Sequence, residues 1–182
     1  MMSKFKITIS DVLWVVGLII VVWLLKQYVF LSVIVSGSSM DPTMADGERV
    51  IALKMTEVER FDIVTFPAPD APDKSYIKRV IGLPGDTVEY RDDTLYINGK
   101  AYEEPYLEEF KSRLPEGQLL TYNFTLEEVT GLDTVPEDSV FVMGDNRQNS
   151  RDSRSFGFIK KADISGDVWF SFWPLDKIGA VD

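Results

Sequence analysis

Hydrophobic residues follow two different patterns along the chain. A nearly uninterrupted apolar segment covers residues 12–30, in which Lys26 is the first charged residue. Beyond it, apolar residues come in short alternating stretches separated by turn residues, which is typical of β-strands. The pattern predicts one helix near the N-terminus followed by a mainly β domain.

The apolar segment is long enough to cross a membrane. A spanning helix needs about 20 apolar residues, and residues 12–31 reach that length if Lys26 extends its side chain to the interface. Lys4 and Lys6 precede it against the single acid Asp11, so the positive-inside rule places the N-terminus in the cytoplasm. We therefore expect a single-pass protein of the plasma membrane, with a cytoplasmic tail over residues 1–11, a transmembrane anchor over residues 12–31 and an extracytoplasmic domain over residues 32–182.

Two other interpretations of this segment stay open. Basic residues, an apolar stretch and the small residues 36–38 are also the pattern of a cleaved signal peptide. A buried core helix is the second alternative. The anchor is favoured because the strongest functional motif begins where cleavage would occur.

The remaining pattern predicts a set of short strands. Asn98 and Gly99 indicate a two-residue hairpin turn between residues 94–97 and 100–102, because both turn positions take positive φ. The acidic, less periodic stretch 100–138 predicts an insertion or cap, with a short helix around residues 107–111. The other strands are expected over residues 49–54, 61–66, 75–83, 87–90, 139–143 and 167–172.

Composition narrows the possible chemistry. The chain has 182 residues, a net charge of -10, no Cys and no His. This acidity argues against nucleic acid as a partner, since phosphate binding requires a basic face. Without Cys or His there is no thiolate nucleophile, no Ser-His-Asp triad and no zinc site built on these ligands. A hydrolytic enzyme of this composition would need Lys, Asp, Glu or Tyr as its base.

The first of three motifs with candidate chemistry is SGSSMDPTM at residues 36–44. Small residues allow close backbone approach and Pro42 fixes a turn. A serine on such a turn can present an exposed hydroxyl beside backbone N–H groups that would hold an oxyanion. A Ser/Gly-rich linker between helix and domain is the alternative.

The second motif is YIKRVIGLPGD at residues 76–86. On a strand, alternate residues share a face, so Tyr76 and Lys78 point one way and Arg79 the other. A free lysine has a pKa of about 10.4, but burial among apolar groups lowers it until the neutral amine can accept a proton from a serine. A lysine that extends from a sheet edge into solvent is the alternative.

The third motif is GDNRQNSRDSR at residues 144–154. It follows an expected strand and is dense in hydrogen-bonding groups. A polar surface turn with solvated charges is the alternative. The residues that could fix this loop by ion pairs, or hydrogen-bond the lysine amine, are Asp145, Arg147, Ser150, Asp152, Ser153 and Arg154.

Together, and in this order after one span, the motifs resemble those of type I signal peptidases, the bacterial leader peptidases. That family has a serine before Met-x-Pro-Thr, a lysine in Tyr-Ile-Lys-Arg-x-x-Gly-x-Pro-Gly-Asp, and Gly-Asp-Asn-Arg-x-x-Ser-x-Asp-Ser-Arg. Residues 60–64 (RFDIV) are similar to a fourth family segment. The short length and single span are similar to the Gram-positive form. The resemblance covers roughly residues 10–175, with no motif over 100–138.

The resemblance implies an antiparallel, all-β catalytic core lying against the membrane, and a mechanism without metal or cofactor. Ser39 would be the nucleophile, with its own backbone N–H as an oxyanion donor, and Lys78 the general base. The implied supporting residues are Ser150, as a hydrogen-bond partner of the lysine, together with Asp145, Asp152 and Arg154.

The implied function is cleavage of secreted preproteins after a small-x-small motif, which removes their signal peptides. The expected partners are these preproteins, the lipid bilayer and the secretion translocon. Two alternatives stay open: another Ser-Lys protease, such as a pilus-subunit or otherwise specialised peptidase, and a catalytically idle, anchored binding module. An idle copy would be expected to lose Ser39 or Lys78, and both are present.

Three positions depart from the family pattern. Gly37 stands where some members have a serine that helps form the oxyanion hole, which leaves the second donor unassigned. Gln148 stands in place of an acid, and Phe61 in place of a glycine.

Overall fold

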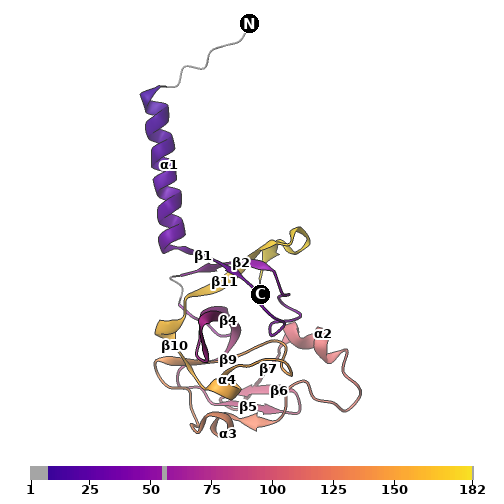
Figure 1. The fold of residues 1–182 in the computed structure, drawn as a ribbon. Coiled ribbons are helices and arrows are strands. Elements are labelled where there is room, and N and C mark those ends of the chain that lie inside the picture. The colour runs from indigo at the N-terminus through magenta and orange to yellow at the C-terminus, as the bar shows by residue number, and fades with distance from the viewer. Residues whose placement is uncertain (1–7, 55–56, 182) are drawn as a thin grey trace.

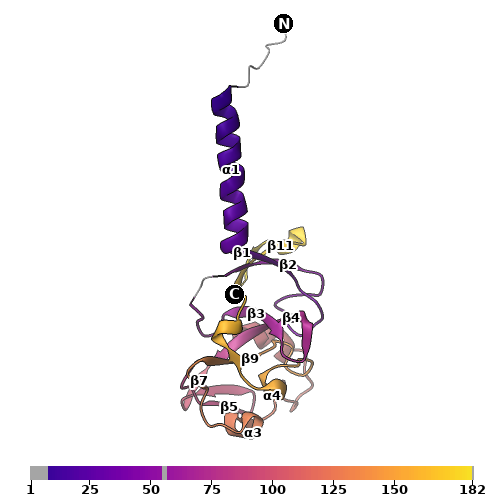
Figure 2. The ribbon, with the colours of Figure 1, turned by 60° about the vertical axis from the view of Figure 1, so that its left-hand side comes forward.

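A computed structural model describes residues 8–54 and 57–181. A single long helix, α1 (Ile9–Tyr28), projects from a body made of two antiparallel sheets (Figure 1). The fold is thus mainly β with one N-terminal helix, as the sequence predicts. In both views the smaller of the two sheets lies at the end of the body far from α1 (Figure 2). The strands that directly follow α1 in the chain lie beside α1 (Figure 1).

α1 has the composition of a membrane span. Its most apolar window has a mean hydropathy of 2.2 and none of it is buried against the body. The core-helix alternative is therefore wrong. Thr8 and Asp11 form a capping box that satisfies the first backbone N–H groups. A helix of 20 residues is about 30 Å long, close to the thickness of the hydrocarbon core.

α1 ends at Tyr28, before the predicted end of the anchor at residue 31, because the chain turns directly into strand β1 (Phe30–Ile34). β1 pairs with β2 (Arg49–Leu53) along its whole length. Cleavage at the small residues 36–38 would remove β1 from this sheet, which weighs against the signal-peptide alternative.

The large sheet carries the second and third motifs. Its order is β1-β2-β11-β3-β4-β9-β10, with β12 paired to β11, and every pairing is antiparallel. The second motif lies on β4 and the third follows β9. The remaining strands of this sheet are β3 (Ile63–Ala68), β4 (Ala71–Gly82), β9 (Ser139–Met143), β10 (Ile159–Lys160), β11 (Gly166–Trp173) and β12 (Gly179–Ala180).

A smaller sheet has the order β7-β6-β5-β8. Asn98 and Gly99 take positive φ between β6 and β7, which confirms the predicted hairpin turn. Its strands are β5 (Val88–Arg91), β6 (Thr94–Ile97), β7 (Lys100–Tyr102) and β8 (Phe124–Thr125). The short helices are η1 (Pro105–Leu107), α2 (Glu108–Lys111), α3 (Leu126–Thr130), α4 (Ser153–Phe156), η2 (Lys161–Asp163) and η3 (Leu175–Lys177).

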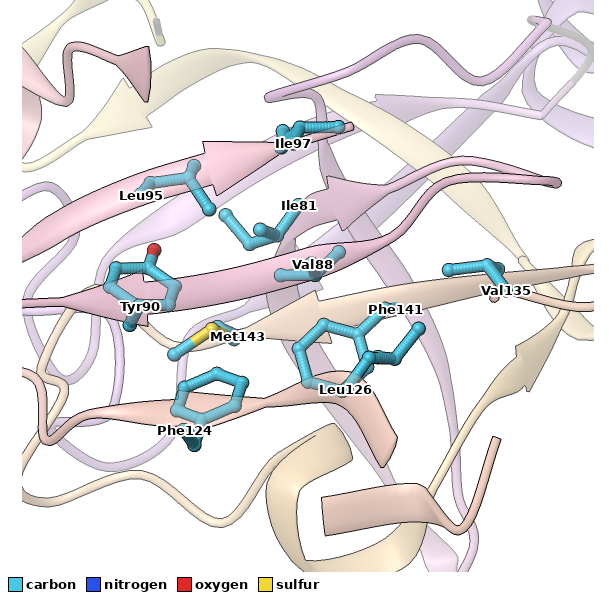
Figure 3. Close-up of a cluster of buried hydrophobic side chains, with 10 residues drawn as sticks. All are labelled: Ile81, Val88, Tyr90, Leu95, Ile97, Phe124, Leu126, Val135, Phe141 and Met143. Carbon is cyan, nitrogen blue, oxygen red and sulfur yellow. The ribbon is translucent and has the colours of Figure 1, made fainter. Parts of the chain in front are cut away.

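The two sheets share a hydrophobic core (Figure 3). Phe141 and Met143 from β9 meet Tyr90 and Leu95 from the small sheet, and all four are almost fully buried. The stretch predicted as an insertion or cap, residues 100–138, begins inside the small sheet and adds three further side chains to this core. These are Phe124, Leu126 and Val135.

Candidate active site

Ser39 and Lys78 come from distant parts of the chain and meet at hydrogen-bond distance. The Lys78 amine Nζ lies 2.7 Å from Ser39 Oγ and 2.9 Å from the carbonyl oxygen of Ile77. Lys78 stands in the middle of β4, opposite Val64 of β3. With a side chain only 3% exposed, it does not extend from a sheet edge into solvent, so that alternative is wrong.

Burial gives Lys78 the electrostatics of a base. The charged ammonium loses water contacts in this position, which lowers the pKa of Lys78 from 10.5 to about 8. The carboxylates of Asp152 and Asp145 act in the opposite direction and limit the shift. A substantial fraction of the amine is therefore neutral near physiological pH and can accept the Ser39 proton.

The Ser39 turn is held from two sides. Its carbonyl oxygen accepts a 3.0 Å hydrogen bond from the Asn146 N–H, and the Asn146 amide donates to the Ser38 carbonyl oxygen at 3.0 Å. Below the turn, Met40 and Met44 are buried in a core cluster. This packing marks the first motif as part of the folded domain rather than a flexible linker.

The backbone N–H groups near Ser39 are the candidate hydrogen-bond donors for an oxyanion. The Gly37 N–H already donates to Asp46 Oδ1 at 2.8 Å. Within residues 8–54 and 57–181, the Ser39 N–H has no hydrogen-bond acceptor, so it is available to a bound substrate. The Ser38 hydroxyl accepts a 3.0 Å bond from the Asn149 amide.

Asp145 connects all three motifs. Its carboxylate accepts two bonds from the Arg79 guanidinium, at 3.0 and 2.8 Å, and one from the Thr43 hydroxyl at 2.6 Å. The sequence makes Asp145 one of two acids that could pair with an arginine of its own loop, but its partner in the structure is Arg79 of the second motif. The reason lies in the strand register, which places Arg79 of β4 directly opposite Met143 of β9.

Phe61 also holds Arg79 in place. The Phe61 carbonyl oxygen accepts a 2.9 Å bond from Arg79 Nη1. Phe61 has a φ of 73°, in the left-handed region that favours glycine. This conformation accounts for the glycine of the family pattern at this position.

Asp152 and Arg154 form the predicted ion pair within the third motif. Two Arg154 nitrogens donate to the Asp152 carboxylate at 2.8 Å each, and the Gly144 N–H donates to it at 3.0 Å. Burial alone would raise the pKa of Asp152, but the bonds from Arg154 and Gly144 keep it below its usual value. Asp152 is therefore a fixed negative charge near Lys78.

Ser150 does not make the expected hydrogen bond to Lys78. Among the residues that the structure describes, its hydroxyl has no well-formed hydrogen bond, although it is close enough to Asp152 to help lower the pKa of that carboxyl. The lysine amine instead donates to Ser39 Oγ and to the carbonyl oxygen of Ile77. Ser150 instead packs on Gly144, where a side chain would also press within 2.5 Å of the Ser39 carbonyl oxygen.

A second buried ion pair was not predicted from the sequence. The Arg147 guanidinium pairs with Glu104, and their side chains are 0% and 1% exposed. The hydroxyls of Tyr90 and Tyr106 also contact this pair. Glu104 lies in a stretch without a motif. Its acidic side chain was therefore the one feature of the sequence that could have suggested a partner for Arg147.

A cleft opens at the Ser39–Lys78 pair. It has a volume of about 220 Å³ and lies between residues 34–40 and 75–78, with Asn149 and Arg151 at its rim. β4 pairs with β9 only from Arg79 to Gly82, so within residues 8–54 and 57–181 the segment 75–78 has no strand partner on that side. The open edge can accept an extended peptide as an additional strand.

Comparisons with known proteins identify the family of the chain. The model of the family "Signal peptidase, peptidase S26" matches residues 8–173. Signal peptidase I of Bacillus caldolyticus is 47% identical over 168 residues, and signal peptidase IB of Staphylococcus aureus is 37% identical over 175 residues; each alignment covers 90% of both chains. A crystal structure of a signal peptidase I from Enterococcus faecalis V583 matches with a TM-score of 0.60 and 50% identity, covering 62% of this chain and 97% of that one. The chain therefore belongs to the signal peptidase family, peptidase S26, a family of membrane-anchored peptidases.

Proposed function

We propose that this protein removes signal peptides from secreted preproteins, with Ser39 as nucleophile and Lys78 as general base. The observation that carries the proposal is the 2.7 Å contact between the Ser39 hydroxyl and an amine that is buried at the centre of a strand. Family membership supports the peptidase activity, and the geometry of the pair supports its assignment to these two residues.

The reaction follows from the positions of these groups. The neutral Lys78 amine takes the Ser39 proton as Oγ attacks the scissile carbonyl carbon. The Ser39 N–H donates to the developing oxyanion. Lys78 then gives its proton to the leaving amine, and a water deprotonated by Lys78 hydrolyses the acyl-enzyme. Asp145 and Asp152 act as supporting residues, since they fix the loops around the pair and hold negative charge near it.

The cleft supports a preference for small side chains. Its volume of about 220 Å³ is shared by the peptide backbone and the side chains that enter it. A preprotein strand beside residues 75–78 would direct alternate side chains into it. This period of two matches a small-x-small motif, in which only alternate residues are restricted in size.

The helix supports an anchored enzyme with its body outside the cytoplasm. α1 leads directly into β1, so the body lies at the C-terminal end of the helix, close to the membrane surface where the helix would leave the bilayer (Figure 1). Cleavage sites of preproteins emerge at this surface, and anchoring raises the effective concentration of enzyme and substrate there. We propose the bilayer and the secretion translocon as the further partners of the enzyme.

The test uses full-length protein in detergent and a preprotein whose signal peptide ends in Ala-x-Ala. We expect one cut, with sequencing placing the new N-terminus directly after that motif. Ser39→Ala should lower kcat at least about 10⁴-fold, while Ser112→Ala, which changes an exposed serine at the end of α2 and away from the cleft, should remain active. Cleavage only at other sequences would favour a different Ser-Lys protease, and no cleavage at all would favour an idle binding module.

A further inference from the structure

The cleft beside Ser39 has an unusual charge for this chain. Over the described part of the chain, its lining includes the cations Lys78 and Arg151 but no carboxylate, although the whole chain has a net charge of -10. Lys78 is buried and engaged by Ser39. Arg151 lies at the rim, and its side chain is 63% exposed. It is therefore the cleft cation within reach of a bound peptide's side chains.

Arg151 is positioned by one acid. Its guanidinium forms an ion pair with Asp70, which lies in the turn between β3 and β4. Tyr76 is close to both groups: burial and Asp70 raise the pKa of the Tyr76 hydroxyl, and the charge of Arg151 lowers it. Arg151 thus sits over the part of β4 that contains Tyr76.

The register of β4 relates Arg151 to the reacting atoms. Tyr76 and Lys78 share a face of the strand, and the Lys78 amine lies 5.2 Å from the centre of the Tyr76 ring. Two residues of strand span about 7 Å. A peptide that lies along β4 with its scissile carbonyl at Ser39 therefore brings a residue two or three positions from the cut to Arg151.

We propose that Arg151 is a specificity-determining residue that favours an acidic preprotein side chain within three residues of the scissile bond. This inference rests on the proposed function, because it concerns the same cleft and the same reaction. The long guanidinium can form two parallel bonds to a carboxylate, and it repels a lysine at the same position.

Asp70 is the residue whose removal should change the preference in the opposite direction. Its carboxylate pairs with Arg151 in the free enzyme and so competes with an acidic substrate for the same guanidinium. Removing the Asp70 charge should therefore strengthen the preference, whereas removing the Arg151 charge should abolish it. A merely structural role for this ion pair would predict the same effect from both changes.

The experiment compares preproteins that carry Asp, Asn or Lys at each of three positions on either side of the cut. For the wild-type enzyme we expect a kcat/KM ratio of Asp to Lys of about threefold or more at one position, as fits an exposed charge contact. The ratio should fall as salt is added. Arg151→Gln should bring it close to one, and Asp70→Asn should raise it. Arg113→Gln is the matched control, because Arg113 is a similarly exposed member of an ion pair on α2 and its flank.

The ratio is measured within each variant, so a change in the folded fraction does not affect it. A flat charge profile in the wild type, or a ratio that survives Arg151→Gln, would overturn the inference. The neutral Asn substrates separate this outcome from failure of the proposed function. If wild-type enzyme cleaves the Asp, Asn and Lys substrates equally well, only the role of Arg151 is wrong. If it cleaves none of them, including the Asn substrates, the proposed function is wrong.

Discussion

Lys78 places an ionisable amine where a hydrophobic side chain would pack better. Its side chain is 3% exposed, and its pKa falls from 10.5 to about 8 because burial disfavours the charged form. A shift of this size corresponds to about 3 kcal/mol of destabilisation when the amine is protonated. The same property that makes Lys78 a base therefore weakens the fold.

Lys78→Met should show both sides of this relation. The variant should be inactive and, at neutral pH, about 1–3 kcal/mol more stable than the wild type, with the lost bonds to Ser39 and Ile77 offsetting part of the gain. The folded-state pKa of about 8 lies below the unfolded value of 10.5, so the unfolded chain binds more protons between these pH values. Wild-type stability consequently rises with pH across this window, and the advantage of Lys78→Met should shrink there. Urea unfolding of full-length protein in detergent measures both effects; a less stable variant at neutral pH would contradict the burial argument.

At the scale of elements, the small sheet and the third motif are joined by buried charges. Glu104 follows β7, and Arg147 follows β9, yet their side chains form an ion pair with 1% and 0% exposure. Neither charge has solvent nearby to replace its partner. Such a pair contributes little net stability when intact but is costly to break.

Glu104→Gln should therefore destabilise the protein by about 3 kcal/mol, because it leaves the Arg147 charge buried without a carboxylate. Glu109→Gln is the matched control, since it breaks the ion pair between Glu109 and Arg113. The side chains of these two residues are 53% and 64% exposed, respectively. That change should cost less than about 1 kcal/mol. Chemical denaturation of both variants checks the difference, and equal losses would show that burial does not set the strength of these pairs.

The elements that the sequence predicts best are those with a local signal. The strands over residues 94–97 and 139–143 match β6 and β9, since alternation and turn residues mark both ends. The predicted anchor over residues 12–31 includes the first two residues of β1, because these apolar residues continue the hydropathy of the helix. Only the pairing of β1 with β2 distinguishes the strand from the helix.

The site, too, could be predicted only where the sequence has a local signal. The motifs identify Ser39 and Lys78 as candidates. The partners of Asp145 depend on strand register and could not be predicted from the spacing of residues in the sequence. Asp145 bonds to Arg79, which is 66 positions away. Glu104 is 43 positions from Arg147 and belongs to no motif. Contacts of this kind are set by the packing of two sheets and leave no local pattern in the chain.

At the scale of the whole molecule, the proposed topology places the N-terminus and the body on opposite sides of a membrane. The chain has no Cys, so single cysteines can report on each side without background. We expect an impermeant maleimide to label Glu137→Cys on intact cells, since this position is exposed on the body. Ser3→Cys should be labelled only after the membrane is opened. Labelling of both positions on intact cells, or the reverse pattern, would contradict the orientation.

The most direct test of the central claim is kcat/KM for a preprotein as a function of pH, measured with full-length wild-type enzyme. The base must be neutral to act, so activity should rise with pH along a single limb whose midpoint reports the pKa of Lys78 in the free enzyme. We predict a midpoint near pH 8, because burial lowers the pKa of Lys78 to about 8. A limb at the ordinary lysine pKa of 10.5, or a rate that does not change with pH, would contradict the assignment of Lys78 as the buried general base of Ser39.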